Sequence, residues 1–516
     1  MKLRYSNLLI ISAFFVIGIS AISVSCKSKE AEGEKLAQTY CASCHLLPSP
    51  AMLPKNVWQY STLPYMGILM GVATEINGLE KPLSDYAILR PASQMISDED
   101  WLKIKRYYLA NAPKTLEMPK YENLEVLTGR FEIQKTNIAI QGATIPNFTA
   151  VTIDTSNRKI IAGDQSNRVI WILDQNGKPI QTITNQNALT NVDLTNAKKS
   201  QYLLTYIGTT TQANPDVNGS AEQVEIKNNT FINTKKLLPS LNRPIEVITK
   251  NLDDSPEDEL ISNEFGFKNG GLSIWKKDAK NQYQKQILSI QTGATKTIVM
   301  DFDGDKRNDI LALFAQGDEQ IVLYLNKGNS NGTSIRFEAK QLLRFPSIYG
   351  TSSFDIADIN KDGKFDIVCT AGDNADFSTI LKPYHGVYVY TNTGSVGSPQ
   401  FEQSHFFQQN GATKVISRDF DNDGDIDLVS IALFPDNDHR PLEGFIYFEN
   451  TGNDFKQKTL NINHLGRWSV IDAADIDHDG DIDMVLGSHP VAKFPAGFDQ
   501  AWKQGSGLVI LRNKTK

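Results

Sequence analysis

The chain has 516 residues, of which 40% are hydrophobic and 22% are charged. This composition is ordinary for a folded protein and excludes extensive disorder, and the length accommodates two or three domains or one large array of repeats. The formal net charge of −7, together with the absence of a lysine- or arginine-rich block, argues against a nucleic-acid partner.

Residues 1–25 have the pattern of an export signal. Lys2 and Arg4 precede an uncharged apolar run from Leu8 to Val24, which is typical of a secretory signal peptide. An uncleaved membrane helix is the alternative interpretation. Cys26 follows the run, as in the processing site of bacterial lipoproteins, which this segment resembles. The resemblance implies that Cys26 is lipidated and that the protein is exported to the bacterial cell envelope, lipid-anchored on the periplasmic side or at the outer-membrane surface.

Cys41, Cys44 and His45 form the motif C-x-x-C-H, the attachment pattern of c-type haem. Two thiols at this spacing reach the two vinyl groups on one edge of a porphyrin, and the adjacent histidine ligates the iron. A C-x-x-C pair alone also occurs in redox and zinc sites, but the histidine that follows favours haem. The export signal directs the chain to the compartment in which c-type haem is attached. The sequence therefore predicts one covalent haem c.

The region around this motif, over residues 31–113, resembles a small class I cytochrome c domain. Such domains close with a helix, and Ser97 is a suitable N-cap for one, followed by Trp101, Ile104 and Tyr108 on a shared apolar face.

The resemblance also implies a sixth iron ligand. The candidates are Met66, Met70 and Met95. Met95 lies only two residues before the predicted cap, whereas Met66 follows Trp58 in a pattern similar to that of short c-type domains. We therefore favour Met66, and the alternative for any single methionine is core packing.

Beyond Pro119 the chain consists of β-branched runs separated by Asp, Asn and Gly, and an acidic segment recurs four times. Each copy places carboxylate or amide oxygens at positions 1, 3, 5 and 9. Oxygens at alternate positions of a tight turn suit a hard cation such as Ca²⁺, so we expect three to four calcium sites, with solvated acidic turns as the alternative. The predicted ligands are Asp301, Asp303, Asp305, Asp309, Asp358, Asn360, Asp362, Asp366, Asp419, Asp421, Asp423, Asp427, Asp475, Asp477, Asp479 and Asp483.

Position 6 of these segments needs a sharp turn, and three copies place a glycine there: Gly363, Gly424 and Gly480. The copy that begins at Asp301 departs from the pattern with Lys306, which leaves the affinity of that site open. Cys369 lies in an apolar run after the second copy, and we interpret it as a buried core residue rather than as half of a disulfide.

Each acidic segment leads directly into two apolar strands, and the four segments start between 56 and 61 residues apart. Degenerate copies precede them: one from Asn251 keeps oxygens at the same alternate positions, and two earlier ones keep the strands but few ligands. The total is seven units, which predicts a closed β-propeller. The motif resembles the FG-GAP/VCBS repeats of integrin-α-type propellers over residues 125–516. This resemblance implies calcium loops between strands on one face.

The expected fold is therefore multidomain, with a small all-α cytochrome c domain followed by an all-β seven-bladed propeller. The predicted boundaries are 1–25 for the signal peptide, 26–113 for the cytochrome domain, 114–124 for a linker and 125–516 for the propeller.

These features favour an exported, membrane-tethered c-type cytochrome that transfers single electrons, with a propeller that docks a redox partner protein or a polymer or carbohydrate ligand. No catalytic constellation recurs, so whether the protein is itself an enzyme stays open. One alternative is a propeller dehydrogenase that passes electrons to its own haem, although the tryptophans lack the regular spacing of such propellers. Another is a polysaccharide-binding or adhesion lipoprotein. Four loop residues form a weaker candidate ligand site: Asp373, Asn374, His439 and His489.

Overall fold

The computed structural model describes residues 30–78, 91–121, 123–138, 144–212, 217–228, 230–253, 255–266, 269–330, 334–373, 380–452, 454–489 and 499–515. These residues form two compact units. The predicted signal peptide 1–25, Cys26 and Asn374 lie outside the described residues. Among the described residues, none of the helices combines the length and hydrophobicity that crossing a bilayer would require.

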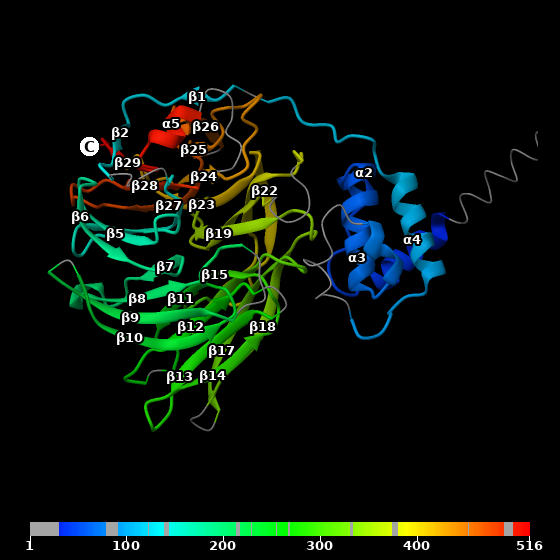
Figure 1. Ribbon diagram of the computed structural model, residues 1–516, viewed down its shortest axis with the longest axis horizontal. Coiled ribbons are helices and arrows are strands. Elements are labelled where there is room, and N and C mark those ends of the chain that lie inside the picture. Colours follow the sequence, from blue (N-terminus) through cyan, green and yellow to red (C-terminus); the bar gives the residue numbers. More distant parts are fainter. Residues whose placement is uncertain are drawn as a thin grey trace, which may run out of the picture. The chain divides into compact units, whose positions relative to one another are not determined.

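The first unit is helical and contains the described residues up to Met118, with short segments around 346–348 and 380–382. In Figure 1 its helices α2, α3 and α4 are blue. Its elements are a helix over 30–40, η1 (Pro50–Met52), α2 (Lys55–Val57), the π-helical η2 (Trp58–Thr62), α3 (Leu63–Leu69), η3 (Ala73–Gly78) and α4 (Asp98–Asn111).

Helix α4 begins where the sequence predicts. The Ser97 hydroxyl accepts a hydrogen bond from the Asp100 backbone N–H at 3.1 Å, which caps the helix. Trp101, Ile104 and Tyr108 are buried on one face, as expected. Their positions at intervals of three and four residues form the stripe that a helix buries against its neighbours.

The helix over 30–40 crosses α4 at Gly33. A Cβ atom at this position would lie 2.4 Å from the Lys103 carbonyl oxygen and 2.8 Å from the Tyr107 Cβ. Any side chain here would push the two backbones apart, because close-packed interiors accommodate added atoms only at a cost.

The second unit is a seven-bladed all-β propeller, in which each blade is a meandering antiparallel sheet (Figure 1). The strands of blades 1 to 3 are β3 (Phe148–Asp154), β4 (Lys159–Asp164), β5 (Val169–Asp174) and β6 (Pro179–Thr184); β7 (Leu189–Asp193), β8 (Gln201–Tyr206), β9 (Gly219–Lys227) and β10 (Thr230–Leu241); β11 (Pro244–Lys250), β12 (Glu259–Glu264), β13 (Gly271–Lys277) and β14 (Tyr283–Ser289).

Blades 4 to 6 continue the same order. Their strands are β15 (Ala294–Met300), β16 (Asp309–Phe314), β17 (Gln320–Ser330) and β18 (Ser334–Arg344); β19 (Thr351–Ala357), β20 (Asp366–Ala371), β21 (Gly386–Asn392) and β22 (Phe401–Gln408); β23 (Ala412–Arg418), β24 (Asp427–Ala432), β25 (Phe445–Asn450) and β26 (Phe455–Thr459). Short helices η6 (Ala197–Lys199), η7 (Asn463–Leu465) and α5 (Asp499–Gln504) lie between strands.

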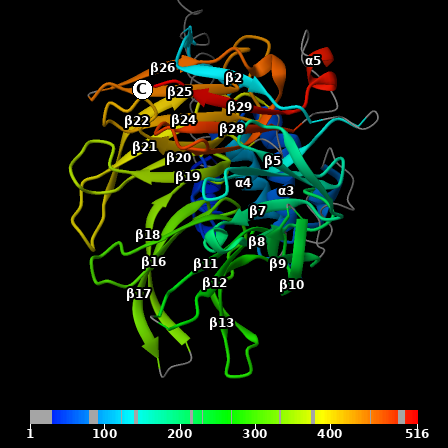
Figure 2. The same cartoon turned by 90° about the vertical axis from the view of Figure 1, so that its left-hand side faces the viewer.

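Blade 7 is completed by the start of the propeller. Its strands β27 (Trp468–Ala474), β28 (Asp483–Ser488) and β29 (Leu508–Asn513) are joined by β2 (Phe131–Lys135), which pairs antiparallel with β29. Figure 2 shows the cyan β2 beside the red β29. The still earlier β1 (Glu125–Val126) adds a parallel edge to β26.

The first strands of the blades contact one another in a closed cycle: β3, β7, β11, β15, β19, β23, β27 and again β3. Every residue of the second strands β12, β16, β20, β24 and β28 is buried. These strands are covered on both faces, which explains their nearly continuous apolar sequences. Cys369 in β20 is 0% exposed, which confirms its interpretation as a core residue.

Candidate functional site

The four acidic segments form the loops between the first and second strands of blades 4 to 7. In each loop, position 1 immediately follows the first strand, and position 9 is the first residue of the second strand. In blade 6, for example, Asp419 follows β23 and Asp427 begins β24. The nine-residue segment therefore forms the whole connection between the two antiparallel strands.

The position 1 carboxylates stabilise the turns of their loops by accepting hydrogen bonds from backbone N–H groups. The N–H of the residue at position 6 donates to this carboxylate in all four loops, at distances of 2.8 to 3.1 Å. Position 6 has a positive φ throughout, between 70° and 100°. Gly363, Gly424 and Gly480 adopt this conformation without strain, whereas Lys306 adopts it with φ 70°. The blade 4 loop thus keeps the shared geometry despite its lysine.

The position 9 carboxylates are almost completely buried, with exposed fractions of 0 to 1%. Each accepts the N–H of an asparagine on the third strand, at 2.7 to 2.9 Å. These asparagines are Asn326, Asn392, Asn450 and Asn513. The nine-residue loop pattern did not predict them as part of the site. The signal that identifies them is an asparagine repeated on the third strand of each of these blades.

Three loops bring three carboxylates within 4.8 Å of one another. The groups are Asp301, Asp303 and Asp309; Asp419, Asp421 and Asp427; and Asp475, Asp477 and Asp479. In the fourth loop, Asp358 and the Asn360 amide oxygen both accept the Asp362 N–H, at 3.0 and 3.1 Å.

Several oxygens in these loops lack a hydrogen-bond donor. Among the described residues, Asp419 Oδ1, Asp477 Oδ1 and Asp481 Oδ1 are buried without one. Burial raises the pKa of Asp427 to about 7, although Tyr447 donates to it. Burial and the Asp479 carboxylate raise the pKa of Asp481 to about 7. A bound cation would contact the oxygens that lack a donor, and it would stabilise the ionised form of the carboxylates whose pKa is raised. The donor atoms are all oxygens, which fits Ca²⁺.

Protein cations neutralise these loops only in part. The Arg130 guanidinium lies 3.0 Å from Asp421, and Arg512 lies 2.7 Å from Asp483 and 3.4 Å from Asp477. The degenerate blade 3 loop, residues 251–259, has a comparable ion pair, in which the Lys276 ammonium of β13 contacts Asp253. In blade 4 the Lys327 ammonium of β17 lies 3.4 Å from Asp303 at the equivalent loop position.

The C-x-x-C-H motif lies at the end of the helix over 30–40. The Cys41 N–H donates to the Ala37 carbonyl at 2.9 Å, so the motif continues the last helical turn. Both Cys41 and Cys44 are free thiols, and burial, with a smaller contribution from Cys44, raises the pKa of Cys41 to about 11. His45 Nδ1 lies 3.1 Å from the Leu46 carbonyl oxygen. Because a carbonyl can only accept, Nδ1 carries the proton and Nε2 keeps the lone pair that a metal ligand needs.

Cys41 and Met66 are both partly buried against the same apolar core, which contains Trp58, Trp101 and Tyr108. Met70 is 7% exposed, and Met95 is 52% exposed. Cys41 and Met66 lie beside this core, whereas the Cys44 thiol is exposed. Two thiols, a histidine and a thioether are the residue types that a haem c would use. The choice of Met66 as sixth ligand stays a prediction.

In the weaker candidate site, His439 and His489 make contacts with residues of the propeller rather than with each other. His439 Nδ1 lies 3.0 Å from a carboxylate oxygen of Asp436 three residues earlier. The His489 N–H donates to the Arg467 carbonyl, and burial together with Arg467 lowers the pKa of His489 to about 4. The lowered pKa of His489 leaves it neutral near neutral pH.

The sequence matches the FG-GAP-like repeat family over residues 301–369 and 419–486. The first segment contains the Asp301 and Asp358 loops, and the second contains the Asp419 and Asp475 loops. The protein thus carries FG-GAP-like repeats within its seven-bladed propeller. No curated protein matches the chain. Among solved structures, a protein of unknown function from Bacteroides caccae aligns at 10% identity and a TM-score of 0.29, over 50% of this chain and 82% of that one; this likeness carries no argument.

Proposed function

We propose that this protein is an exported, membrane-tethered c-type cytochrome that transfers single electrons, and that its propeller is a calcium-stabilised docking module. The observation that carries the electron-transfer role is the C-x-x-C-H motif at the end of a helix, beside an apolar core that also contacts Met66. The FG-GAP-like repeats support the docking role, because propellers commonly present ligand sites on their loops.

Each residue of the helical unit has a distinct part in this proposal. Cys41 and Cys44 would hold one haem c through thioether bonds, and His45 and Met66 would ligate its iron. A haem c held in this way would supply one-electron transfer, and a thioether ligand would raise its potential. The core of Trp58, Trp101 and Tyr108 partly buries Cys41 and Met66. Cys26 carries the lipid that holds the protein at the membrane.

The ligand assignment is tested by absorption spectroscopy and redox titration of the holoprotein. We expect Met66→Ala to remove the near-infrared charge-transfer band of sulfur-ligated ferric haem and to lower the potential. The haem should stay covalently attached, because both thiols remain. Met95→Ala is the matched control and should leave the spectrum unchanged. The opposite result for the two variants would overturn the choice of Met66.

The haem itself is tested by mass spectrometry and by the reduced absorption spectrum after expression with c-type maturation. The wild-type chain should gain the mass of one haem, and Cys41→Ser combined with Cys44→Ser should not. Membrane attachment is tested separately with Cys26→Ala, which should leave an unlipidated precursor. Unchanged mass and partitioning of that variant would favour an uncleaved membrane helix.

A polysaccharide-binding or adhesion role for the whole protein is the second candidate function. It is favoured by the propeller with FG-GAP-like repeats, which accounts for most of the described residues. A holoprotein that carries no haem but binds a glycan would select this candidate over electron transfer.

A further inference from the structure

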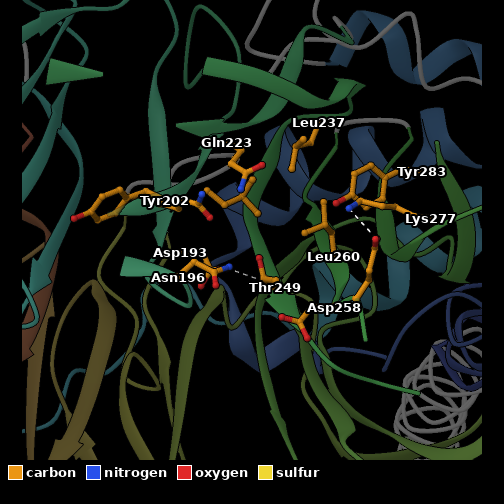
Figure 3. A pocket seen from close by; sticks show the side chains of 13 residues that line it. Asp193, Asn196, Tyr202, Gln223, Leu237, Thr249, Asp258, Leu260, Lys277 and Tyr283 are labelled. Carbon is orange, nitrogen blue, oxygen red and sulfur yellow. Dashed lines mark hydrogen bonds and ion pairs between the residues drawn. The ribbon is translucent and has the colours of Figure 1, made fainter. Parts of the chain in front are cut away.

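A cavity of about 270 Å³ lies between blades 2 and 3 (Figure 3). Its walls come from the blade 2 strands β8 and β9, from the blade 3 strands β13 and β14, and from the 251–259 loop. None of the predicted haem or calcium ligands lines it. Its volume is close to the lower end of the range of about 300–1,000 Å³ that is usual for small-molecule sites, which suits a ligand of one or two rings.

The polar part of the wall consists mainly of amides. Asn196, Gln201 and Gln223 line the cavity, and none of the three side chains has a hydrogen bond to another described residue. A primary amide has two donor hydrogens and an acceptor oxygen, so these groups offer both roles to a ligand. Figure 3 shows Asn196 and Gln223 on different sides of the cavity.

The charged groups give the cavity a negative balance. Three carboxylates and one ammonium line it, and the Lys277 ammonium is paired with Glu257 at 2.9 Å. Asp193 accepts the Thr249 N–H at 2.8 Å and is thereby held in the wall. Asp258 is exposed and, within the part of the chain that the structure describes, has no ion pair. This balance disfavours phosphates, uronic acids and other anions.

The remaining wall is apolar. Leu203 and Leu260 are buried beneath the cavity, with exposed fractions of 5% and 2%, and Tyr283 and Leu237 are partly buried beside them. The Lys277 ammonium lies 5.6 Å from the centroid of the Tyr283 ring, which fixes the ring at the edge of the cavity. An aromatic ring beside aliphatic side chains packs well against the C–H face of a pyranose.

We propose that this cavity binds a neutral sugar unit of a glycan. A neutral pyranose has an apolar face and a rim of hydroxyls, each of which donates and accepts. The leucines and Tyr283 match the face, while the unpaired amides and Asp258 match the rim. Carboxylates accept from hydroxyls, and amides both donate to them and accept from them. This inference rests on the docking role proposed for the propeller, and it is independent of haem and calcium.

The test is isothermal titration calorimetry of the full chain against neutral hexasaccharides: a β-1,4-glucan, an α-1,4-glucan and a β-1,4-mannan. Hexagalacturonate and hexalysine serve as the anionic and cationic probes. We expect at least one neutral hexasaccharide to bind and both charged probes to give no heat. Gln223→Leu and Asn196→Leu should each weaken this binding by about tenfold or more, because a bound hydroxyl loses its partner.

Gln181→Leu on the outer strand β6 is the matched control and should bind like the wild-type chain. Far-UV circular dichroism verifies the fold of each variant, and Tyr283→Ala provides a third test of the apolar wall. The inference is overturned if no neutral hexasaccharide binds, if hexalysine binds in their place, or if all pocket variants retain wild-type affinity. The haem spectrum and the effect of calcium on melting are read on the same samples, so a failure here is distinguishable from a failure of the electron-transfer role.

Discussion

The loop between the first two strands of blade 3, residues 251–259, and its counterpart in blade 6, residues 419–427, share backbone hydrogen bonds but differ in how completely their acidic oxygens are paired. In both, a buried carboxylate at position 9 accepts the N–H of position 2: Glu259 from Leu252 at 2.9 Å, and Asp427 from Phe420 at 3.2 Å.

The two loops differ in what faces the acids. In blade 3 the Lys276 ammonium, which belongs to β13, contacts Asp253. In blade 6 the Asp419 Oδ1 atom is buried with no donor among the described residues. The Arg130 guanidinium lies 3.0 Å from Asp421 in blade 6, so both loops have a protein cation at position 3. The difference is the buried Asp419 oxygen, which we expect an external cation to contact. If it does, the stability of blade 6 depends on the calcium concentration, whereas that of blade 3 does not.

Removal of calcium is the strongest way to separate the two kinds of loop. With Ca²⁺ at about 100 times the dissociation constant, each occupied site adds roughly 2.7 kcal/mol to the free energy of unfolding, if the unfolded chain binds none. Three or four sites then contribute much of a domain's usual net stability of about 5–15 kcal/mol. We expect EGTA to lower the propeller melting temperature substantially in scanning calorimetry. An unmoved propeller transition would mean that the acidic loops are solvated turns.

Lys276→Met tests the ammonium that contacts Asp253. The change leaves the Asp253 carboxylate, whose side chain is 1% exposed, without its ion-pair partner, so we expect a loss of about 1–3 kcal/mol. This loss should be equal in calcium and in EGTA, as measured by denaturant unfolding. Lys280→Met removes an exposed lysine of the same blade and should change little. A loss seen only in EGTA would show that the blade 3 loop itself binds calcium.

Glu259→Gln tests how the blade 3 loop responds to pH. Burial, with a contribution from Asp253, raises the pKa of Glu259 to about 7. The unfolded state therefore ionises first, so this group's stabilising contribution is present below about pH 4.3 and decreases as the pH rises to about 7. Glutamine keeps an oxygen for the Leu252 N–H and cannot ionise. The variant should show a flatter decline in melting temperature between pH 5 and 7; an unchanged slope would contradict the assignment.

Lys306→Gly should have the smallest effect. Lys306 has φ 70° at the position where the other three metal loops have glycine. A left-handed conformation costs a side-chain-bearing residue roughly 1–2 kcal/mol, and the greater freedom of glycine in the unfolded state offsets part of the gain. We expect a gain of no more than about 1 kcal/mol in calcium. Lys306→Ala keeps the Cβ atom and should give none.

Much of the propeller could be predicted because its signals are local. The acidic loops, the apolar second strands and the spacing of 56 to 61 residues together predict the seven blades. The closure of blade 7 by Phe131–Lys135 was not predicted, because this short strand carries no loop of its own and pairs with residues at the other end of the chain. The inter-blade cavity could not be predicted either, because Gln223 and Tyr283 belong to no shared motif and line one cavity only through the packing of two blades.

The structure adds contacts to the acidic loops that the sequence did not predict. The Asn450 N–H holds Asp427 from the third strand, 23 positions away, and no spacing rule within the nine-residue loop indicates it. Lys276 was missed for the same reason, because it lies two strands from Asp253 in the antiparallel sheet. Contacts within one loop are visible in the sequence, whereas contacts across a sheet require the register.

The pairing of β2 with β29 determines when the ring can be completed during synthesis. Phe131 of β2 pairs with Asn513 of β29. Strand β2 is made early and β29 late, so β2 cannot pair until most of the propeller has been synthesised. Such a contact has almost the largest sequence separation that the propeller allows, so its formation is slow. A polypeptide that lacks Leu508–Asn513 also lacks the partner of β2, so the ring cannot close before β29 has been made.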